Sequence, residues 1–150
     1  MPVPRKIEGF LEVLQSVGDR QDRIELLIEI ADRFREVPSE VATRPFDPRH
    51  LIPHCESEAY VWSLSESDGS LKFFFAVENP QGISARAMAV ILDEGLSGEP
   101  LEEVAKVEND LPLEIFGREL SMGKTMGLNG MVAMVRLAAV RALGARTLGE

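Results

Sequence analysis

Apolar positions in the first third of the chain recur at helical spacing. In "DRQDRIELLIEIADRF" they fall at steps of three and four residues: Ile24, Leu27, Ile28, Ala31 and Phe34. Asp19, the first residue of this stretch, is placed as an N-cap, because its carboxylate can accept hydrogen bonds from first-turn amides. A shorter set predicts an earlier helix that ends near Gly18: Ile7, Phe10, Leu11 and Leu14. We expect the two helices to pair as a hairpin.

The pattern changes to strict alternation in the middle of the chain. "AYVWSLSE" sets Tyr60, Trp62 and Leu64 against Ala59, Val61 and Ser63. After the turn sequence "SDGS", "LKFFFAVE" places one apolar face at Leu71, Phe73, Phe75 and Val77. The two segments predict a β-hairpin. A two-stranded hairpin is marginal in water, so other elements must cover one of its faces.

Three further helices are predicted downstream. "SARAMAVILDEG" ends at Gly95, a residue suited to a C-terminal cap, and "SGEPLEEVAKV" has Pro100 near its first turn. The last segment, "GLNGMVAMVRLAAVRAL", has one apolar stripe: Leu128, Met131, Val132, Val135, Ala138, Ala139 and Ala142. Arg141 and Arg146 lie near its negative end. These elements predict an α+β fold, a small antiparallel sheet packed on one side by helices, in a single domain over residues 1–150.

Composition narrows the classes of partner and the compartment. The 150 residues carry a net charge of −9, which repels nucleic-acid phosphates and anionic lipid surfaces, so we expect neither as a partner. The longest apolar runs are short of a bilayer span, and "MPVPRKIEGF" lacks the apolar centre of a secretory signal. A single cysteine, which forms no internal disulfide, fits a reducing compartment. We therefore expect a cytoplasmic protein, either a monomer or a weak homodimer.

That cysteine, Cys55, is the main candidate for chemistry. It lies between a loop containing Pro38, Pro45, Pro48 and Pro53 and the first predicted strand. The position favours a thiol that another macromolecule can reach, and Arg49, His50 and His54 would stabilise the reactive thiolate, whereas Glu56 and Glu58 would oppose it. The alternative is a small apolar residue packed in the core, a common role for a lone cysteine. The residues alone leave both interpretations open.

Other motifs near Cys55 are less informative. His50, His54 and Cys55 are close enough to suggest a zinc site, but Pro53 disfavours a helix there and no fourth ligand follows at zinc-site spacing. Both histidines adjoin Cys55, an arrangement that does not favour a cysteine hydrolase. "GKT" at 123–125 is not a phosphate-binding loop, because Arg118 stands where that motif needs glycine. We expect residues 123–127 to form the loop and first turn of the last helix.

Two separated stretches resemble the SufE family, sulfur-acceptor proteins that serve cysteine desulfurases in iron–sulfur cluster assembly. The first is Cys55-x-Ser57-x-Ala59-Tyr60-Val61, and the second is Ser121-x-x-Lys124-x-x-Gly127-Leu128-x-x-Met131-Val132. The order of elements agrees from about Ile7 to Ala142. The family usually has glycine before the cysteine and arginine in the second motif, where this chain has His54 and Lys124. Lysine keeps the charge but lacks the planar donor set of arginine.

The resemblance implies a function and a set of site residues. Cys55 would accept persulfide sulfur, and the loop and partner contacts would come from His54, Glu56, Ser57, Lys124 and Gly127. The partners would be a cysteine desulfurase, which holds the pyridoxal phosphate, and the scaffold complex for cluster assembly; this chain would bind no cofactor or metal itself. Tyr60, Trp62 and the apolar end of the last helix would shelter the persulfide. The alternatives are a non-catalytic adaptor with a structural Cys55, and a zinc-binding module.

Overall fold

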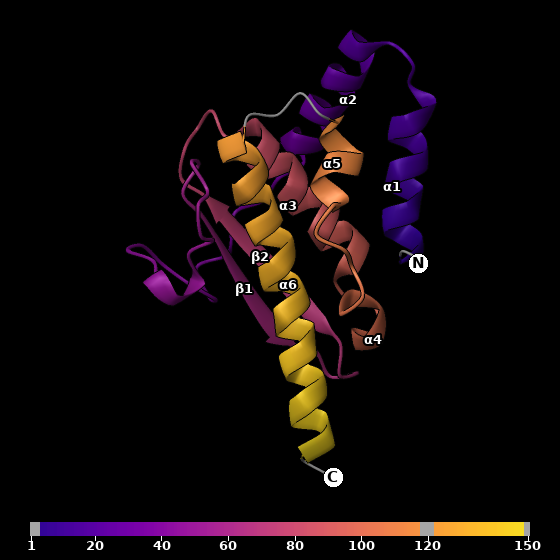
Figure 1. The fold of residues 1–150 in the computed structure, drawn as a ribbon. Helices are drawn as coiled ribbons and strands as arrows, with labels where there is room; N and C mark the ends of the chain where they lie inside the picture. Colours follow the sequence, from indigo (N-terminus) through magenta and orange to yellow (C-terminus); the bar gives the residue numbers. More distant parts are fainter. Residues whose placement is uncertain (1–3, 118–121, 149–150) are drawn as a thin grey trace.

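A computed structural model describes residues 4–117 and 122–148 of the chain (Figure 1). The elements, in order, are α1 (Arg5–Ser16), α2 (Arg20–Asp32), η1 (Pro48–His50), β1 (Ala59–Ser65), β2 (Leu71–Val77), α3 (Ile83–Leu96), α4 (Leu101–Val104), α5 (Leu111–Phe116) and α6 (Met122–Leu148). The fold is α+β with one antiparallel pair of strands in the described residues, as the sequence predicts.

The hairpin follows from the alternation in its sequence. Ala59 pairs with Val77 at one end and Ser65 with Leu71 at the other. In the turn, Gly69 has a φ of 88°, a conformation that glycine adopts without a steric penalty. The Asp68 carboxylate accepts hydrogen bonds from the Ser70 amide at 3.0 Å and from the Ser70 hydroxyl at 2.6 Å. These bonds hold the pKa of Asp68 below its usual value.

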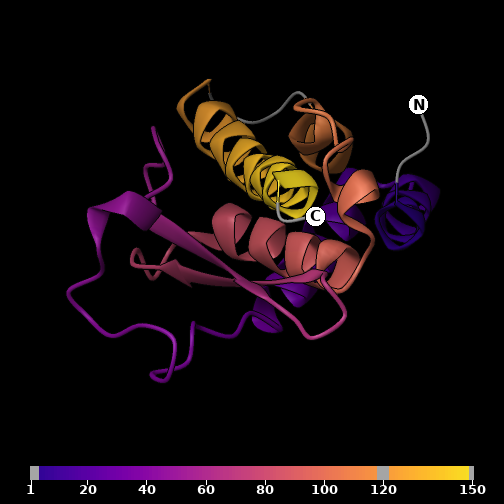
Figure 2. The same ribbon diagram turned by 90° about the horizontal axis from the view of Figure 1, so that it is seen from below.

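The helices cover one face of the hairpin. Figure 2 shows α3 and α6 lying across that face, with the loop before β1 on the opposite side. Phe73 on β2, Ile91 on α3 and Met131 on α6 are at most 1% exposed and share one core. α3 contacts α1, α2, α6 and β2, and α6 also contacts α4, α5 and β1. α3 is therefore the central helix of the core.

The first two helices differ from the prediction in two ways. The Asp19 cap is confirmed, since its carboxylate accepts from the Gln21 and Asp22 amides. However, α1 and α2 each pack mainly on α3 instead of forming a hairpin with each other. The predicted apolar stripe is also partly wrong, because Ile24 and Ile28 are 37% and 40% exposed. Because α2 is apolar on more than one side, its periodicity does not identify the face that meets α3, where Ile30 and Ala31 are buried.

The prediction for Gly95 is wrong. α3 continues to Leu96 and is capped by Ser97, so Gly95 lies inside the last turn of the helix. A Cβ atom at Gly95 would overlap the Cδ1 atom of Ile7, which is fully buried. Glycine serves here to let α1 approach α3 closely, and not to end the helix.

α6 confirms most of the predicted apolar stripe. Leu128, Met131, Val132, Val135 and Ala139 are at most 2% exposed, while Ala138 and Ala142 are partly buried. The helix begins at Met122, so residues 123–127 are already helical and do not form an entry loop. α5, in contrast, was not predicted. By length and composition alone, Lys124–Arg146 could cross a membrane, but its apolar stripe packs on the other elements of this core.

Candidate functional site

Cys55 lies in a tight turn between the proline-rich loop and β1. The Glu58 amide donates to the Cys55 carbonyl oxygen at 3.1 Å, which closes the turn. The Ile52 amide donates to the Ala59 carbonyl at 2.9 Å, and the Asn79 amide donates to the Ser57 carbonyl at 3.1 Å. Backbone bonds on both sides therefore attach the turn to the end of the hairpin.

His54 adopts a left-handed backbone conformation. Its φ is 61°, and Glu58 at the other end of the turn has a φ of 50°. Non-glycine residues seldom adopt such angles, because Cβ then approaches the neighbouring backbone. Because His54 and Glu58 hold these angles without being glycine, the turn carries local strain.

Three glycines let the turn lie directly against α3 and α6. A Cβ atom at Gly127 would lie 2.8 Å from the Cys55 Cα and 3.1 Å from the His54 carbonyl oxygen. At Gly130 it would lie 3.0 Å from the Pro53 carbonyl oxygen, and at Gly82 2.8 Å from the Ser57 Oγ. Any larger side chain at these positions would push the turn away. Gly127 of the second sequence motif therefore packs on the Cys55 turn of the first, while Ser121 of that motif lies outside the described residues.

A cavity of about 350 Å³ opens beside the Cys55 turn. Its walls are both polar and apolar: Cys55, Glu56, Ser57, Asn79, Gln81, Gly82, Ile83, Ser84, Ala85, Lys124, Gly127 and Leu128. Five of the six predicted site residues thus line one cavity, although they come from two distant segments. His54 is not in its lining, but it is exposed and adjoins the cavity through its contact with Gly127. Their functional roles stay predictions.

The surroundings of Cys55 combine partial burial with two helix amino termini and a lysine. The side chain is half-buried and packs against the edge of the main core. α3 begins at Ile83 and α6 begins at Met122, so the amino-terminal ends of two long helices meet at the cavity with Lys124. Both helix ends and the lysine favour a negatively charged group, whereas Glu56 disfavours it. The Cys55 side chain is therefore half-buried at a cavity whose wall contains both a cation and a carboxylate.

The loop before β1 is held against the outer face of the sheet. Val37, Phe46, Trp62 and Ala76 form a second buried cluster there, and the Phe46 ring lies 5.0 Å from the Trp62 ring. The Arg44 guanidinium bonds to both Glu36 and Glu78, and this contact lowers the pKa of Glu36. The Arg49 guanidinium similarly lowers the pKa of Asp47 to about 2.

The predicted shelter for a persulfide is wrong in its aromatic part. Tyr60 and Trp62 belong to the outer cluster, on the face of the sheet opposite to the main core. Alternation along β1 directs Ala59 and Val61 inward and these two rings outward. The apolar walls beside Cys55 are instead Ile83, Ala85 and Leu128, so only the α6 part of the prediction agrees with the cavity.

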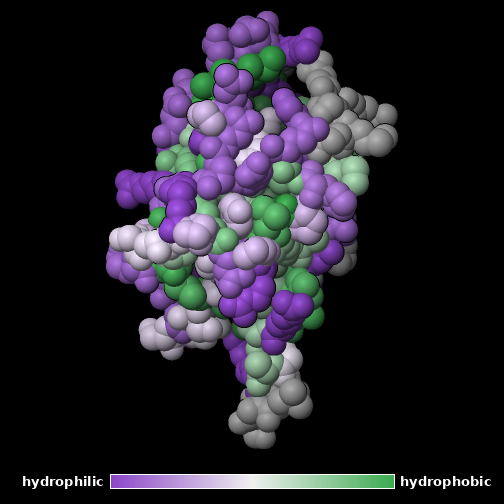
Figure 3. Space-filling model, turned by 90° about the vertical axis from the view of Figure 1, so that its left-hand side faces the viewer, coloured by the Kyte–Doolittle hydropathy of each residue, from purple (hydrophilic) through white to green (hydrophobic). Residues whose placement is uncertain are grey.

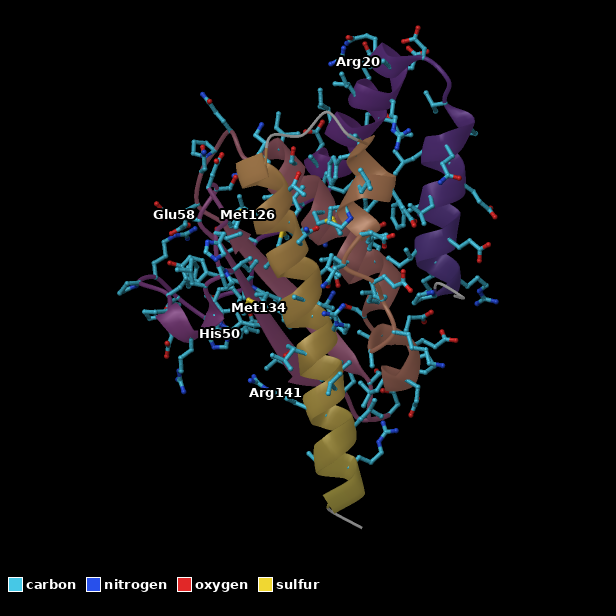
Figure 4. All side chains as sticks on the ribbon, in the orientation of Figure 1. Arg20, His50, Glu58, Met126, Met134 and Arg141 are labelled. Atoms are coloured by element: carbon cyan, nitrogen blue, oxygen red, sulfur yellow. The ribbon has the colours of Figure 1, made fainter. Side chains whose placement is uncertain are left out.

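The zinc hypothesis gains no support from the described residues. The His50 Nδ1 atom lies 3.0 Å from the Val61 carbonyl oxygen, and the ring stacks on Trp62 at 5.3 Å. His50 is therefore engaged on the outer side of β1; Figure 4 labels it beside that strand. Within residues 4–117 and 122–148, no three histidine, cysteine or carboxylate side chains are grouped for a metal.

Sequence reasoning missed the wall of the cavity that precedes and begins α3. Asn79 and Gln81 are exposed, and the Asn79 side chain accepts a hydrogen bond from the Gln81 amide at 2.9 Å. The Gly82 amide donates to the Asn79 carbonyl at 3.0 Å, which completes the turn into the helix. The stretch "ENPQGIS" reads as a turn, but only the fold places that turn opposite Cys55.

The chain thus combines an α+β fold with a single cysteine on a glycine-lined turn beside the ends of two helices. The SufE family, described as an Fe-S metabolism associated domain, matches residues 8–139. The chain belongs to this family, and the family associates it with Fe–S metabolism.

Individual relatives are more distant. SufE-like protein 1 of Arabidopsis thaliana chloroplasts and mitochondria is 22% identical over 148 residues, which are 99% of this chain and 38% of that protein. The chain therefore spans well under half of that relative's length. An uncharacterized SufE-like protein of Mycobacterium tuberculosis is 24% identical over 90% of this chain and 89% of its own. The solution structure of a hypothetical protein from Thermus thermophilus has a TM-score of 0.74 at 26% identity, covering 95% of this chain and 99% of that one.

Proposed function

We propose that this protein accepts sulfane sulfur on Cys55 from the persulfide of a cysteine desulfurase and relays it to the scaffold on which Fe–S clusters are assembled. In this proposal the desulfurase holds the pyridoxal phosphate, and the chain itself binds no cofactor. The desulfurase is also stimulated when its sulfur is removed. We further propose a cytoplasmic location.

The chemical step is thiol exchange with one additional sulfur. The Cys55 thiolate attacks the terminal sulfur of the donor persulfide, so that a new S–S bond forms at Sγ. The donor's S–S bond breaks, and the donor cysteine leaves as a thiolate. The electron count of the two proteins together does not change. The same exchange then passes the sulfur to a thiol on the scaffold.

The observation that carries the proposal is the half-buried Cys55 at the mouth of a cavity of about 350 Å³. The attacking sulfur must be reachable, and the persulfide must afterwards be kept from small reductants. The half-buried position suits both needs, because part of the Cys55 side chain is open to a partner and part is covered by the main core.

Mass spectrometry of the intact chain tests the proposal. The protein is incubated with a cysteine desulfurase, pyridoxal phosphate and cysteine, without reductant. We expect a mass increase of one sulfur atom in the native chain and none in Cys55→Ser, with both proteins equally folded by circular dichroism. Sulfur addition to Cys55→Ser, or none to the native chain with several desulfurases, would reject the proposal.

Alkylation of Cys55 separates this proposal from the adaptor alternative. A cysteine used only for packing reacts with iodoacetamide only after unfolding, whereas an acceptor thiol reacts in the native state. We expect Cys55 to be alkylated without denaturant, at a rate that does not rise in parallel with the unfolding rate when denaturant is added. A rate that tracks global unfolding would favour the adaptor.

Lys124 is proposed to contact the desulfurase beside the cavity. We expect Lys124→Ala to lower the stimulated desulfurase rate several-fold, because a cation at the mouth of the site stabilises the anionic sulfur during transfer. Lys106→Ala is the matched control, since Lys106 is an exposed lysine that does not line the cavity. Equal effects from the two variants would make Lys124 an ordinary surface residue.

A further inference from the structure

β1 pairs with β2 on one side, and its other edge faces the space beside α6. Residues of the loop before β1 fill only part of that space. Along the first part of this edge, the chain itself fills the space: Gly127 and Gly130 of α6 pack on residues 52–55. Leu51 forms an isolated antiparallel bridge with Tyr60, so this segment starts a third strand beside β1. The third strand then stops, and β1 continues for several residues without it.

The open part of the edge has backbone groups that point away from β2. The Ala59 carbonyl accepts from the Ile52 amide, and the Val61 carbonyl accepts from His50 Nδ1. Alternate residues of a strand direct their backbone groups to the same side, so those of Ser63 and Ser65 share this direction. Among the residues that the structure describes, none bonds to the outward amides and carbonyls of these two serines. An added strand would satisfy them.

A hollow of about 100 Å³ accompanies the open edge. It is lined by Val61, Ser63, Phe73, Met134, Leu137, Ala138 and Arg141. Leu137 in this lining is 44% exposed, and Leu64 on the strand is 44% exposed. Figure 3, which faces this side of the molecule, shows apolar side chains gathered in the middle of the face with polar residues around them. The edge is therefore flanked by apolar surface that an added strand could cover.

Arg141 gives the site a charge preference. It is exposed, and it has no ion pair with any residue that the structure describes. In Figure 4, Met134 and Arg141 extend from α6 on the side of β1. An unpaired cation beside an apolar hollow, in a chain of net charge −9, favours a carboxylate on the incoming segment.

We infer that the open edge of β1 at Ser63–Ser65 binds an extended segment of a partner protein by strand addition. The segment presents an apolar side chain to the hollow at Met134 and Leu137, and a carboxylate two residues away to Arg141. Side chains two apart in a strand share a face, so both can point toward α6 while the residues between them face outward.

A second copy of this chain fits the edge less well. Two β1 edges that pair antiparallel about Ser63 would bring the two Arg141 side chains toward each other, and like charges disfavour that arrangement. His50 and Leu51 also cover the start of the edge, which leaves only a few residues to pair. An acidic segment of a different protein avoids the charge repulsion, and a short segment needs only the few open residues of the edge.

The position of the edge deepens the proposed function, on which this role rests. Met134 lies seven residues beyond Gly127 along α6, or about 10 Å at 1.5 Å per residue. A partner segment bound at this edge would hold the partner protein next to Cys55 and raise its effective concentration at the thiol. Binding itself needs no sulfur chemistry, so it can be tested separately.

The test uses the full chain in reductant and the peptide acetyl-Thr-Glu-Thr-Leu-Thr-Glu-Thr-amide, followed by amide and methyl chemical shifts. We expect saturable shifts centred on Ser63, Ser65 and Leu137, with the same affinity in Cys55→Ser. The peptide with lysine in place of both glutamates should bind at least about fivefold more weakly, because it meets Arg141 with like charge.

Two variants locate the binding. Ser63→Pro removes an outward amide without touching the ladder to β2, which proline tolerates at an edge, and should abolish the shifts while the melting temperature stays near that of the native chain. Arg141→Glu should weaken binding about fivefold or more. Arg35→Glu makes the same charge change at an exposed position that does not line the hollow, and it should leave binding unchanged.

Three results would overturn the inference. One is an absence of saturable binding by the native chain; another is binding that neither Ser63→Pro nor Arg141→Glu weakens. The third is self-association of the native chain, in sedimentation, that Ser63→Pro abolishes, because the edge would then serve a second copy. None of these three results bears on the sulfur-transfer proposal, because that proposal is tested separately by the mass of the chain after sulfur is added at Cys55.

Discussion

At the scale of single residues, the close approach between Gly127 and Cys55 determines where the thiol lies. A Cβ atom at Gly127 would stand 2.8 Å from the Cys55 Cα, a distance that real Cβ contacts essentially never show. The obstacle is backbone, so it cannot move aside as the end of a flexible side chain would. The helix and the turn must therefore separate if this glycine is replaced.

We predict that Gly127→Ala destabilises the protein relative to Gly144→Ala on the same helix. At Gly144 a Cβ atom meets nothing within 4 Å, so alanine there should add about 0.5–1 kcal/mol through its helix propensity. Gly127→Ala has the same gain but incurs an overpacking cost of about 1–3 kcal/mol. Urea unfolding measures the difference, and native-state alkylation of Cys55 should become faster in Gly127→Ala alone. Equal stability of the two variants would show that the turn relaxes without cost.

Single residues also show how far the site follows from sequence. Cys55 is the only cysteine, so its candidacy needs no structure. Lys124 and Gly127 follow from the resemblance, but the reason for the glycine is a contact across more than seventy residues of chain. Asn79 and Gly82 escape prediction because their local pattern describes only a turn. What surrounds a site is set by packing between segments, which a linear pattern does not contain.

At the scale of elements, the loop between α2 and β1 is fastened by charge and by aromatic packing. Arg44 joins Glu36 to Glu78, and Arg44 also lies over the Phe46 ring at 4.8 Å. Phe46 in turn packs on Trp62, the only tryptophan in the chain. Fluorescence of Trp62 therefore reports whether the loop is docked.

We predict that acid releases this loop. The pKa of Glu36 is lowered by Arg44, and the pKa of Asp47 is lowered to about 2 by Arg49. Carboxyl groups with a lowered pKa in the folded state stabilise it fully above their unfolded values of 4.5 and 3.8. That contribution is lost as the pH falls through the folded pKa values. Trp62 emission should therefore shift to longer wavelength as the pH falls from about 4.5 to about 2.

Two comparisons isolate the loop in that titration. Glu36→Gln with Asp47→Asn should remove most of the pH dependence of Trp62 emission, because the titrating groups are gone. Asp68→Asn is the matched control, since the pKa of Asp68 is also lowered but its partner Ser70 lies in the hairpin turn. Far-ultraviolet circular dichroism at each pH shows whether the helices remain. A red shift that coincides with helix loss would contradict separate loop release.

The elements differ in how well their pattern predicts them. Strand alternation identified both strands, because each has one face in the core and the alternation is unambiguous. α2 is apolar on several sides, so its buried face depends on where α3 lies. α5 has six residues, too few for a periodic signal. Helix-capping logic also failed at Gly95, where close packing and not termination requires glycine.

At the scale of the whole molecule, charge separates the described sites from their surroundings. The chain has 25 acidic and 16 basic residues, so most of its surface repels anions. Lys124 at the Cys55 cavity and Arg141 at the edge of β1 are cations within this acidic field, both on α6. A partner with a basic docking surface would thus be attracted by the acidic surface, whereas the negatively charged groups of a partner would be held at these two cations.

The last prediction concerns salt and rests on the proposed function. The net charge of −9 should steer a desulfurase with a basic docking surface toward the chain, so their association rate should fall as salt rises. The Debye length drops from about 30 Å at 0.01 M to about 3 Å at 1 M, and we expect the rate constant to fall by about tenfold or more over that range.

Stopped-flow association with the native chain measures this rate constant. The double variant Glu102→Lys with Glu103→Lys should flatten its salt dependence without changing the Cys55 cavity, because neither residue lines that cavity. A rate constant that is insensitive to salt would mean that short-range contacts at Cys55, and not the overall charge, bring the two proteins together.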